Sequence, residues 1–193
     1  MNRRFLIFHI AVALLLFTSC KSEYDQYVRR ELNSGIKNDS LIFGMYMGQT
    51  KRDFFSICWD LNKQKLISQG TGNQMAKYLE PIDSSGDLTL RKEMEFYGIF
   101  DTRDVMRGMN MVYRFTSWSP WTEERHSKFL AEHLKELYLQ SYPGNDFITI
   151  ELNNTEYSAF VKIDGNRQIL IYPINSKDVA VKMEDLNYKL NNR

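Results

Sequence analysis

The first twenty residues constrain this chain most, because they have the layout of a leader that is removed before the rest of the chain folds. Residues 1–4 end in two arginines, and residues 5–17 are apolar apart from one histidine. Small residues at 18–19 then lead to Cys20. A charged start, an apolar centre and small residues before a cysteine are typical of a bacterial lipoprotein signal peptide.

The apolar run is too short to remain in a membrane as a helix, because a helical span needs roughly 20 such residues. We therefore predict that residues 1–19 are a signal peptide and that Cys20 becomes the acylated first residue of the mature protein. The alternative is an ordinary signal peptide in which Cys20 is incidental. Acyl chains on Cys20 would anchor the protein in the membrane, expected to be the outer membrane, on its periplasmic or its cell-surface side.

Composition limits the partners and the means of stabilisation. Lys and Arg number 25 and Asp and Glu number 24, so this nearly neutral chain has no electrostatic basis for binding nucleic acid. Besides Cys20 the chain has only Cys58, which leaves no partner for a disulfide once Cys20 is acylated. We expect residues 20–39 to be a lipidated tether and lead-in, and residues 40–193 to be a domain stabilised by packing.

Two segments have the apolar spacing of helices. Thr50 and Asp53 form a capping box, and the helix expected after it ends near Lys65. Its apolar face is expected to contain Phe54, Phe55, Ile57, Cys58 and Leu61. The second helix is expected to begin at Ser119-Pro120 and to end at Pro143-Gly144.

The remaining apolar segments predict strands, at 40–47, 73–81, 87–100, 105–118, 147–152, 157–163, 168–174 and 179–183. Asp164-Gly165 predicts a hairpin with a type I′ turn. The fold class is therefore α+β, an antiparallel sheet or sheets with one helix packed per half. The two halves, 40–100 and 101–193, are candidates for tandem β-α-β-β units.

Aromatic residues near the second helix are the candidate binding residues. Trp118 and Trp121 flank a turn, and Tyr113 lies on the strand before it. Exposed indoles at a loop stack on sugars or anchor a protein interface, whereas buried ones would pack the helix on the sheet. An exposed indole would be the first candidate contact.

The sequence gives no basis for a metal, a cofactor or a recognisable catalytic motif. His126 and His133 are seven residues apart, too far along one helix to chelate a single ion. The usual nucleophile, metalloprotease, phosphate-loop and Cys-x-x-Cys patterns are absent. We therefore expect a protein that is not an enzyme, with a hydrolase of unknown type as a remaining alternative.

The residues 43–54 (FGMYMGQTKRDF) resemble the start of the SmpA/OmlA family and, more broadly, of beta-lactamase-inhibitor-like repeats. That resemblance implies a capped helix on an antiparallel sheet in a small lipoprotein or inhibitor that binds other proteins. Segments 54–59 and 161–167 are also similar to uncharacterised lipoproteins of Bacteroidota-type bacteria, which implies a location and no activity.

Three functions follow as hypotheses. The leading one is a lipid-anchored, non-catalytic binding or accessory subunit for another envelope protein. The first alternative is a lipoprotein that binds glycan or peptidoglycan through the tryptophans. The second alternative is the hydrolase.

Overall fold

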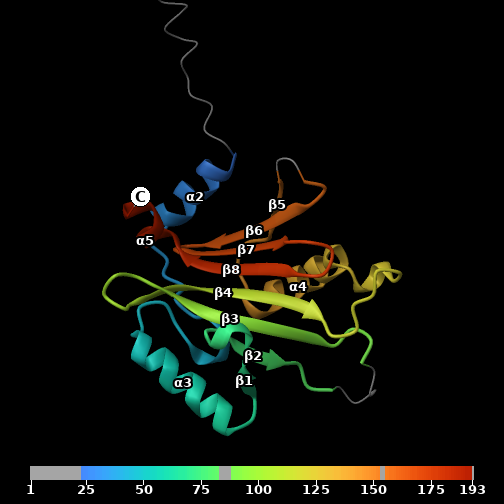
Figure 1. Ribbon diagram of the computed structural model, residues 1–193. Helices are drawn as coiled ribbons and strands as arrows, with labels where there is room; N and C mark the ends of the chain where they lie inside the picture. The colour runs from blue at the N-terminus through green and yellow to red at the C-terminus, as the bar shows by residue number, and fades with distance from the viewer. Residues whose placement is uncertain (1–22, 83–87, 153–154, 193) are drawn as a thin grey trace, which may run out of the picture.

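A computed structural model describes residues 23–82, 88–152 and 155–192, which form a mixed fold of helices and one antiparallel sheet (Figure 1). The α+β fold class expected from the sequence is confirmed. The helices are α2 (Glu23–Asn33), α3 (Lys51–Lys63), α4 (Ser127–Ser141) and α5 (Leu186–Asn191), with 3-10 turns η1 (Ile42–Gly44), η2 (Thr71–Asn73) and η3 (Glu123–Arg125). The strands are β1 (Ile67–Gln69), β2 (Ala76–Leu79), β3 (Lys92–Phe100), β4 (Met106–Phe115), β5 (Ile148–Glu151), β6 (Ser158–Asp164), β7 (Arg167–Pro173) and β8 (Val179–Asp185).

These strands form a single sheet in the order β1-β2-β3-β4-β8-β7-β6-β5, and every neighbouring pair is antiparallel. Each half of the chain is a helix followed by a four-stranded meander, α3 before β1–β4 and α4 before β5–β8. The last strands of the two halves, β4 and β8, pair at the centre of the sheet. The second half was expected to open with the strand at 105–118. That segment is β4, which pairs with β3 and belongs to the first half. Each half therefore begins with its helix and continues with its strands.

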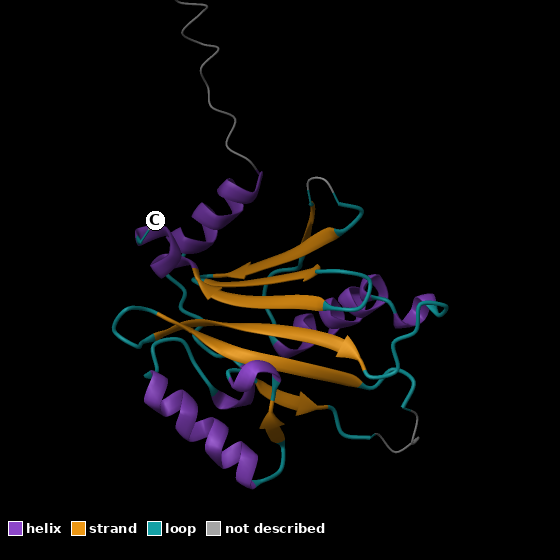
Figure 2. Cartoon of the chain, in the orientation of Figure 1, coloured by secondary structure: helices purple, strands orange, loops and turns teal. Residues whose placement is uncertain are grey.

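One face of the sheet carries the main core. Successive strand residues point to opposite faces, and Met111 of β4 lies opposite both Phe96 of β3 and Val181 of β8, so all three share a face. Phe54 of α3 and Leu134 of α4 are buried in the same cluster. Full burial of a side chain of this size contributes about 1.5–3 kcal/mol. The two long helices are therefore held by the sheet face that they cover (Figure 2).

A smaller cluster lies on the opposite face, at the β6 end of the sheet. Tyr27 and Val28 of α2 pack there with Ile163 of β6 and Leu186 of α5. The Tyr27 hydroxyl donates to the Ile163 carbonyl at 3.0 Å and accepts from the Ile163 amide at 3.2 Å. Within the tether and lead-in expected at residues 20–39, residues 23–33 are therefore a helix docked on the domain. In Figure 1, α2 and α5 lie at one end of the molecule and α3 lies at the other.

The segment 40–47, expected as a strand, reverses its direction instead. Ser40 and Tyr46 pair in an isolated bridge, and η1 joins them. Phe43 has φ of 55° and Gly44 has φ of 72°, both far outside the range of a strand. Gly44 adopts this conformation without a steric cost because it has no Cβ.

The second helix begins at Ser127 rather than at Ser119-Pro120. The Ser119 hydroxyl accepts a hydrogen bond from the Trp121 amide, two residues on, at 3.3 Å. The Ser119 carbonyl accepts from the Thr122 amide and lies 3.0 Å from Nε2 of His126. Ser119 therefore closes a local turn, which is the usual alternative of serine to capping a helix.

The hairpin between β6 and β7 is present, but its turn lies one residue later than expected. Asp164 pairs with Arg167, so the two turn residues are Gly165 and Asn166. Gly165 has φ of 58°, whereas Asn166 is not among the residues with positive φ. Glycine at the first turn position with positive φ only there fits a type II′ turn rather than type I′.

Candidate functional site

Trp118, the first tryptophan of the expected pair, is packed in place. Its indole Nε1 donates to the Ser176 carbonyl at 3.2 Å, and its ring stacks on His126 with centroids 6.3 Å apart. Ser176 lies in the turn between β7 and β8, and its carbonyl also accepts from the Ser127 amide at the start of α4. Trp118 therefore joins the β4–α4 loop to this turn. It has the packing role that the sequence analysis gave as the alternative to a binding role.

Trp121 has the opposite environment. Its side chain is 91 % exposed, the highest value among the exposed large hydrophobic residues of the described chain. Its backbone amide donates a hydrogen bond to the Ser119 hydroxyl at 3.3 Å. The structure therefore separates the two indoles, and Trp121 meets the condition set above for a candidate contact.

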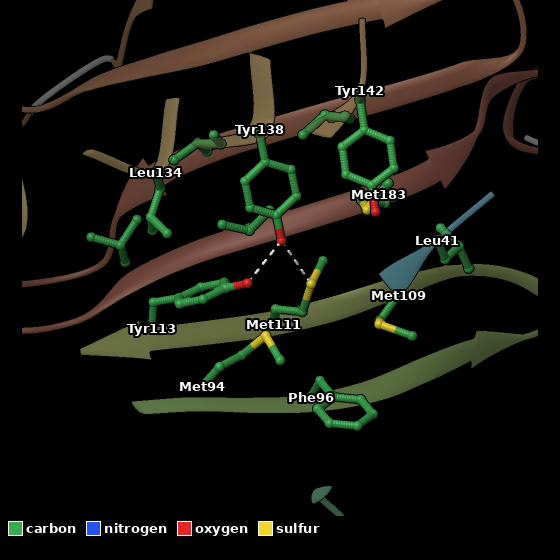
Figure 3. Close-up of a cluster of buried hydrophobic side chains, with 14 of the residues drawn as sticks. Leu41, Met94, Phe96, Met109, Met111, Tyr113, Leu134, Tyr138, Tyr142 and Met183 are labelled. Atoms are coloured by element: carbon green, nitrogen blue, oxygen red, sulfur yellow. Dashed lines mark hydrogen bonds between the residues drawn. The ribbon is translucent and has the colours of Figure 1, made fainter. Parts of the chain in front are cut away.

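Tyr113 is not brought together with the tryptophans. It is 8 % exposed, and its hydroxyl lies 3.0 Å from the hydroxyl of Tyr138 on α4 (Figure 3). Tyr138 donates in turn to the Met111 sulfur at 3.1 Å. Burial raises the pKa of both tyrosines well above the ordinary value. Tyr113 also lines a pocket of about 540 Å³ between α4 and the segment 40–43.

A larger cleft of about 830 Å³ opens at the start of α4, within the range of about 300–1,000 Å³ that is common for ligand sites. Its walls come from η3, the first turn of α4, the start of β6 and the β7–β8 turn. The lining residues are Glu123, Glu124, His126, Ser127, Lys128, Phe129, Ala131, Glu132, Glu156, Tyr157, Ser158, Phe160, Pro173 and Ser176. Four carboxylates, four aromatic side chains (counting His126) and a helix start without a side-chain cap thus face one space.

An exposed aromatic pair on α3 was missed by the sequence reading. Phe55 is 50 % exposed and Trp59 is 64 % exposed, although Phe55 was expected on the buried face. Phe54 is the residue that points inward, at 1 % exposed. Residues four apart on a helix share a face, so the spacing of Phe55 and Trp59 was the available signal.

Of the two cysteines, the structure describes Cys58 and not Cys20. Cys20 lies outside the described residues, so its acylation stays a prediction. Cys58 is a free thiol on α3, and burial raises its pKa to about 11. A thiol with a raised pKa is a poor nucleophile at neutral pH.

His126 and His133 have different surroundings. His126 precedes α4 and stacks on Trp118, whereas His133 lies on α4 beside Phe129. Within residues 23–82, 88–152 and 155–192, no group of three or more His, Cys, Asp or Glu side chains is placed to hold a metal ion. The same part of the chain contains no helix with the length and apolar character of a membrane span.

No protein-family model, no curated protein and no solved structure matches this chain. The similarity to SmpA/OmlA proteins and to Bacteroidota-type lipoproteins therefore stays a prediction from the sequence.

Proposed function

We propose that this chain is a lipid-anchored, non-catalytic binding subunit of a bacterial outer membrane, and that α3 docks it on another envelope protein. The observation that carries the proposal is the aromatic pair Phe55 and Trp59, which lie one turn apart on the outer side of α3 with half or more of each side chain exposed.

The pair is not needed to hold α3 on the sheet. The opposite side of the helix already buries Phe54, and Ile57 and Leu61 pack against the same core. The centres of the Phe55 and Phe54 rings lie 5.4 Å apart in an edge-to-face arrangement, so one side of the Phe55 ring is packed while the rest is open to a partner. Aromatic side chains held in this way contribute most of the binding energy in many protein interfaces.

The position of α3 favours a protein over the bilayer as the partner. The proposed anchor, Cys20, is three residues before Glu23, the first residue of α2. Because α2 contacts β6 and α5 whereas α3 contacts β1 and β3, the two helices lie at opposite ends of the sheet (Figure 1). An anchor next to α2 thus leaves α3 at the end away from the membrane.

Charge around the pair defines the partner surface further. Arg52, Lys63 and Lys65 are exposed at the two ends of α3, and the Lys63 ammonium lies 5.5 Å from the centre of the Trp59 ring. Asp53 and Asp60 offset part of this charge. A partner with an apolar groove edged by acidic side chains would complement both the rings and the excess of positive charge.

Affinity purification from detergent-solubilised envelopes of the native host tests the proposal. The wild-type chain is expected to recover one stoichiometric partner, and a Phe55→Ala/Trp59→Ala variant is expected to lose it. Trp121→Ala is the matched control, since it removes an even more exposed ring elsewhere and should leave recovery unchanged. Repeated recovery of no partner, or equal recovery by the α3 variant, would contradict docking through α3.

A further inference from the structure

We infer that the cleft at the start of α4 is a binding site for a neutral saccharide, separate from the docking surface on α3. The cleft combines hydrogen-bond acceptors, hydrogen-bond donors and aromatic rings in one space of about 830 Å³. Each of these three features limits the class of ligand, and together they favour a molecule rich in hydroxyl groups.

The acceptors are carboxylates. Glu123, Glu124, Glu132 and Glu156 all line the cleft, and all four side chains are exposed. Two of them are offset, because the Lys128 ammonium lies 3.2 Å from the Glu156 carboxylate and the Lys135 ammonium lies 3.5 Å from the Glu132 carboxylate. An anionic ligand would meet an excess of negative charge here.

The donors come from the helix start. His126 occupies the N-cap position of α4 and provides no side-chain hydrogen bond to the first turn, so the Lys128 and Phe129 amides have no cap there. The aligned peptide dipoles also make this end of the helix partly positive. These amides need a hydrogen-bond acceptor, which an ammonium group does not provide and a hydroxyl group does.

Ser127 supplies an independent indication of a ligand. This lining residue is 1 % exposed, and its hydroxyl has no hydrogen-bond partner within the part of the chain that the structure describes. Buried hydroxyl groups without a partner are uncommon and call for an explanation. Each hydroxyl of a saccharide can both donate and accept, so several of them together can satisfy Ser127 and the helix amides and donate to a glutamate.

The rings give such a ligand an apolar contact. Tyr157 is half-buried on the β6 side of the cleft, and Phe129 is 38 % exposed on the α4 side. One face of a sugar ring presents C–H groups, which pack well on the electron-rich face of an aromatic ring.

Isothermal titration calorimetry on the full chain in detergent tests the inference with four tetrasaccharides. Chitotetraose and maltotetraose are neutral, a glucosamine tetramer is cationic and tetragalacturonate is anionic. We expect at least one neutral compound to bind more tightly than both charged ones. No heat from either neutral compound at millimolar concentration, or tighter binding of a charged compound, overturns the inference.

Two variants then locate the site. Tyr157→Ala removes a ring, and Glu124→Gln removes a charged acceptor while keeping the side-chain shape. Loss of one aromatic contact should weaken binding roughly two- to tenfold. Trp59→Ala on α3 is the control and should bind as the wild type does. Weaker binding in either cleft variant supports the site, and unchanged affinity in both overturns it; circular dichroism verifies that each variant is folded.

Discussion

The hydroxyl groups of Tyr113 and Tyr138 lie 3.0 Å apart in the core between β4 and α4. Each is the other's partner, and Tyr138 also donates to the Met111 sulfur (Figure 3). Burying a hydroxyl is tolerable only with such a partner. The pair therefore fixes how α4 sits on the centre of the sheet.

Replacing the two members of this pair should destabilise the protein by amounts that do not add in the double variant. Tyr138→Phe leaves the Tyr113 hydroxyl buried without its partner, at a cost of about 1–3 kcal/mol in the free energy of unfolding. The double variant Tyr113→Phe/Tyr138→Phe should lose less than the sum of the single changes. Urea unfolding measures all three, with Tyr157→Phe as a less buried control. Strictly additive losses would show that the two hydroxyls are not coupled.

The same pair predicts a loss of stability at alkaline pH. Burial raises the pKa of Tyr113 and of Tyr138, so the native state keeps protons that the unfolded chain releases near pH 10. Their contribution is fully present below about pH 10 and is lost as the pH rises further. Urea unfolding between pH 8.5 and 11.5 should show a steeper decline for the wild type than for the double phenylalanine variant. Equal slopes would contradict this.

A buried ion cluster should be among the most sensitive points of the fold. Asp164 lies 3.0 Å from the Lys162 ammonium and 3.7 Å from the Arg167 guanidinium, and all three side chains are at most 7 % exposed. Asp164→Asn leaves two buried cations without their shared carboxylate, which should cost about 3–5 kcal/mol.

Asp60→Asn is the matched control for that change. Asp60 pairs with Lys63 at 3.4 Å on the surface, where both side chains are more than 60 % exposed. An exposed pair of this kind contributes about 0–1 kcal/mol. If chemical denaturation gives similar losses for both variants, the buried cluster does not stabilise the fold as proposed.

Cys58 should react slowly with thiol reagents in the folded protein. Burial raises its pKa from 9.0 to about 11, so its thiolate fraction at pH 8 is roughly a hundredfold lower than that of an unburied thiol. Ellman's reagent added to a Cys20→Ser variant should label Cys58 slowly in buffer and quickly in guanidinium chloride. Equal rates in the two conditions would mean that α3 does not protect the thiol.

Short-range signals made the most reliable parts of the sequence prediction. The Thr50 hydroxyl accepts from the Asp53 amide at 3.1 Å and the Thr50 amide donates to the Asp53 carboxylate at 3.2 Å, as the capping box predicted. Both bonds lie within four residues, so the pattern alone contains the interaction. The helix that follows and most strands were predicted for the same reason.

Features that depend on distant residues were not predictable in this way. The β6–β7 turn is shifted because Asp164 belongs to the strand, where its carboxylate meets Lys162 and the Asn145 amide. The Asp-Gly pair is visible in the sequence. The sequence does not show that the loop after α4 brings Asn145 next to Asp164. The short β1 was missed since three residues give too little alternation to detect.

The candidate site was predictable only in part. Trp118 and Trp121 are only three residues apart, and what distinguishes their environments is the Ser176 carbonyl, which lies 58 residues from Trp118 in the chain. The cleft beside them joins α4 to β6 and the β7–β8 turn, and sequence spacing cannot show that contact. Phe54 and Phe55 are likewise adjacent, and the sheet decides which of them is buried.

Photo-crosslinking in living cells of the native host tests the central claim, docking through α3, most directly. The photoreactive residue p-benzoylphenylalanine would replace Trp59 in one strain and Gln140, an exposed residue of α4, in another. We expect irradiation to give one discrete adduct of higher mass from the Trp59 position and none from the Gln140 position. No adduct from the Trp59 position, or the same adduct from both positions, would contradict the claim.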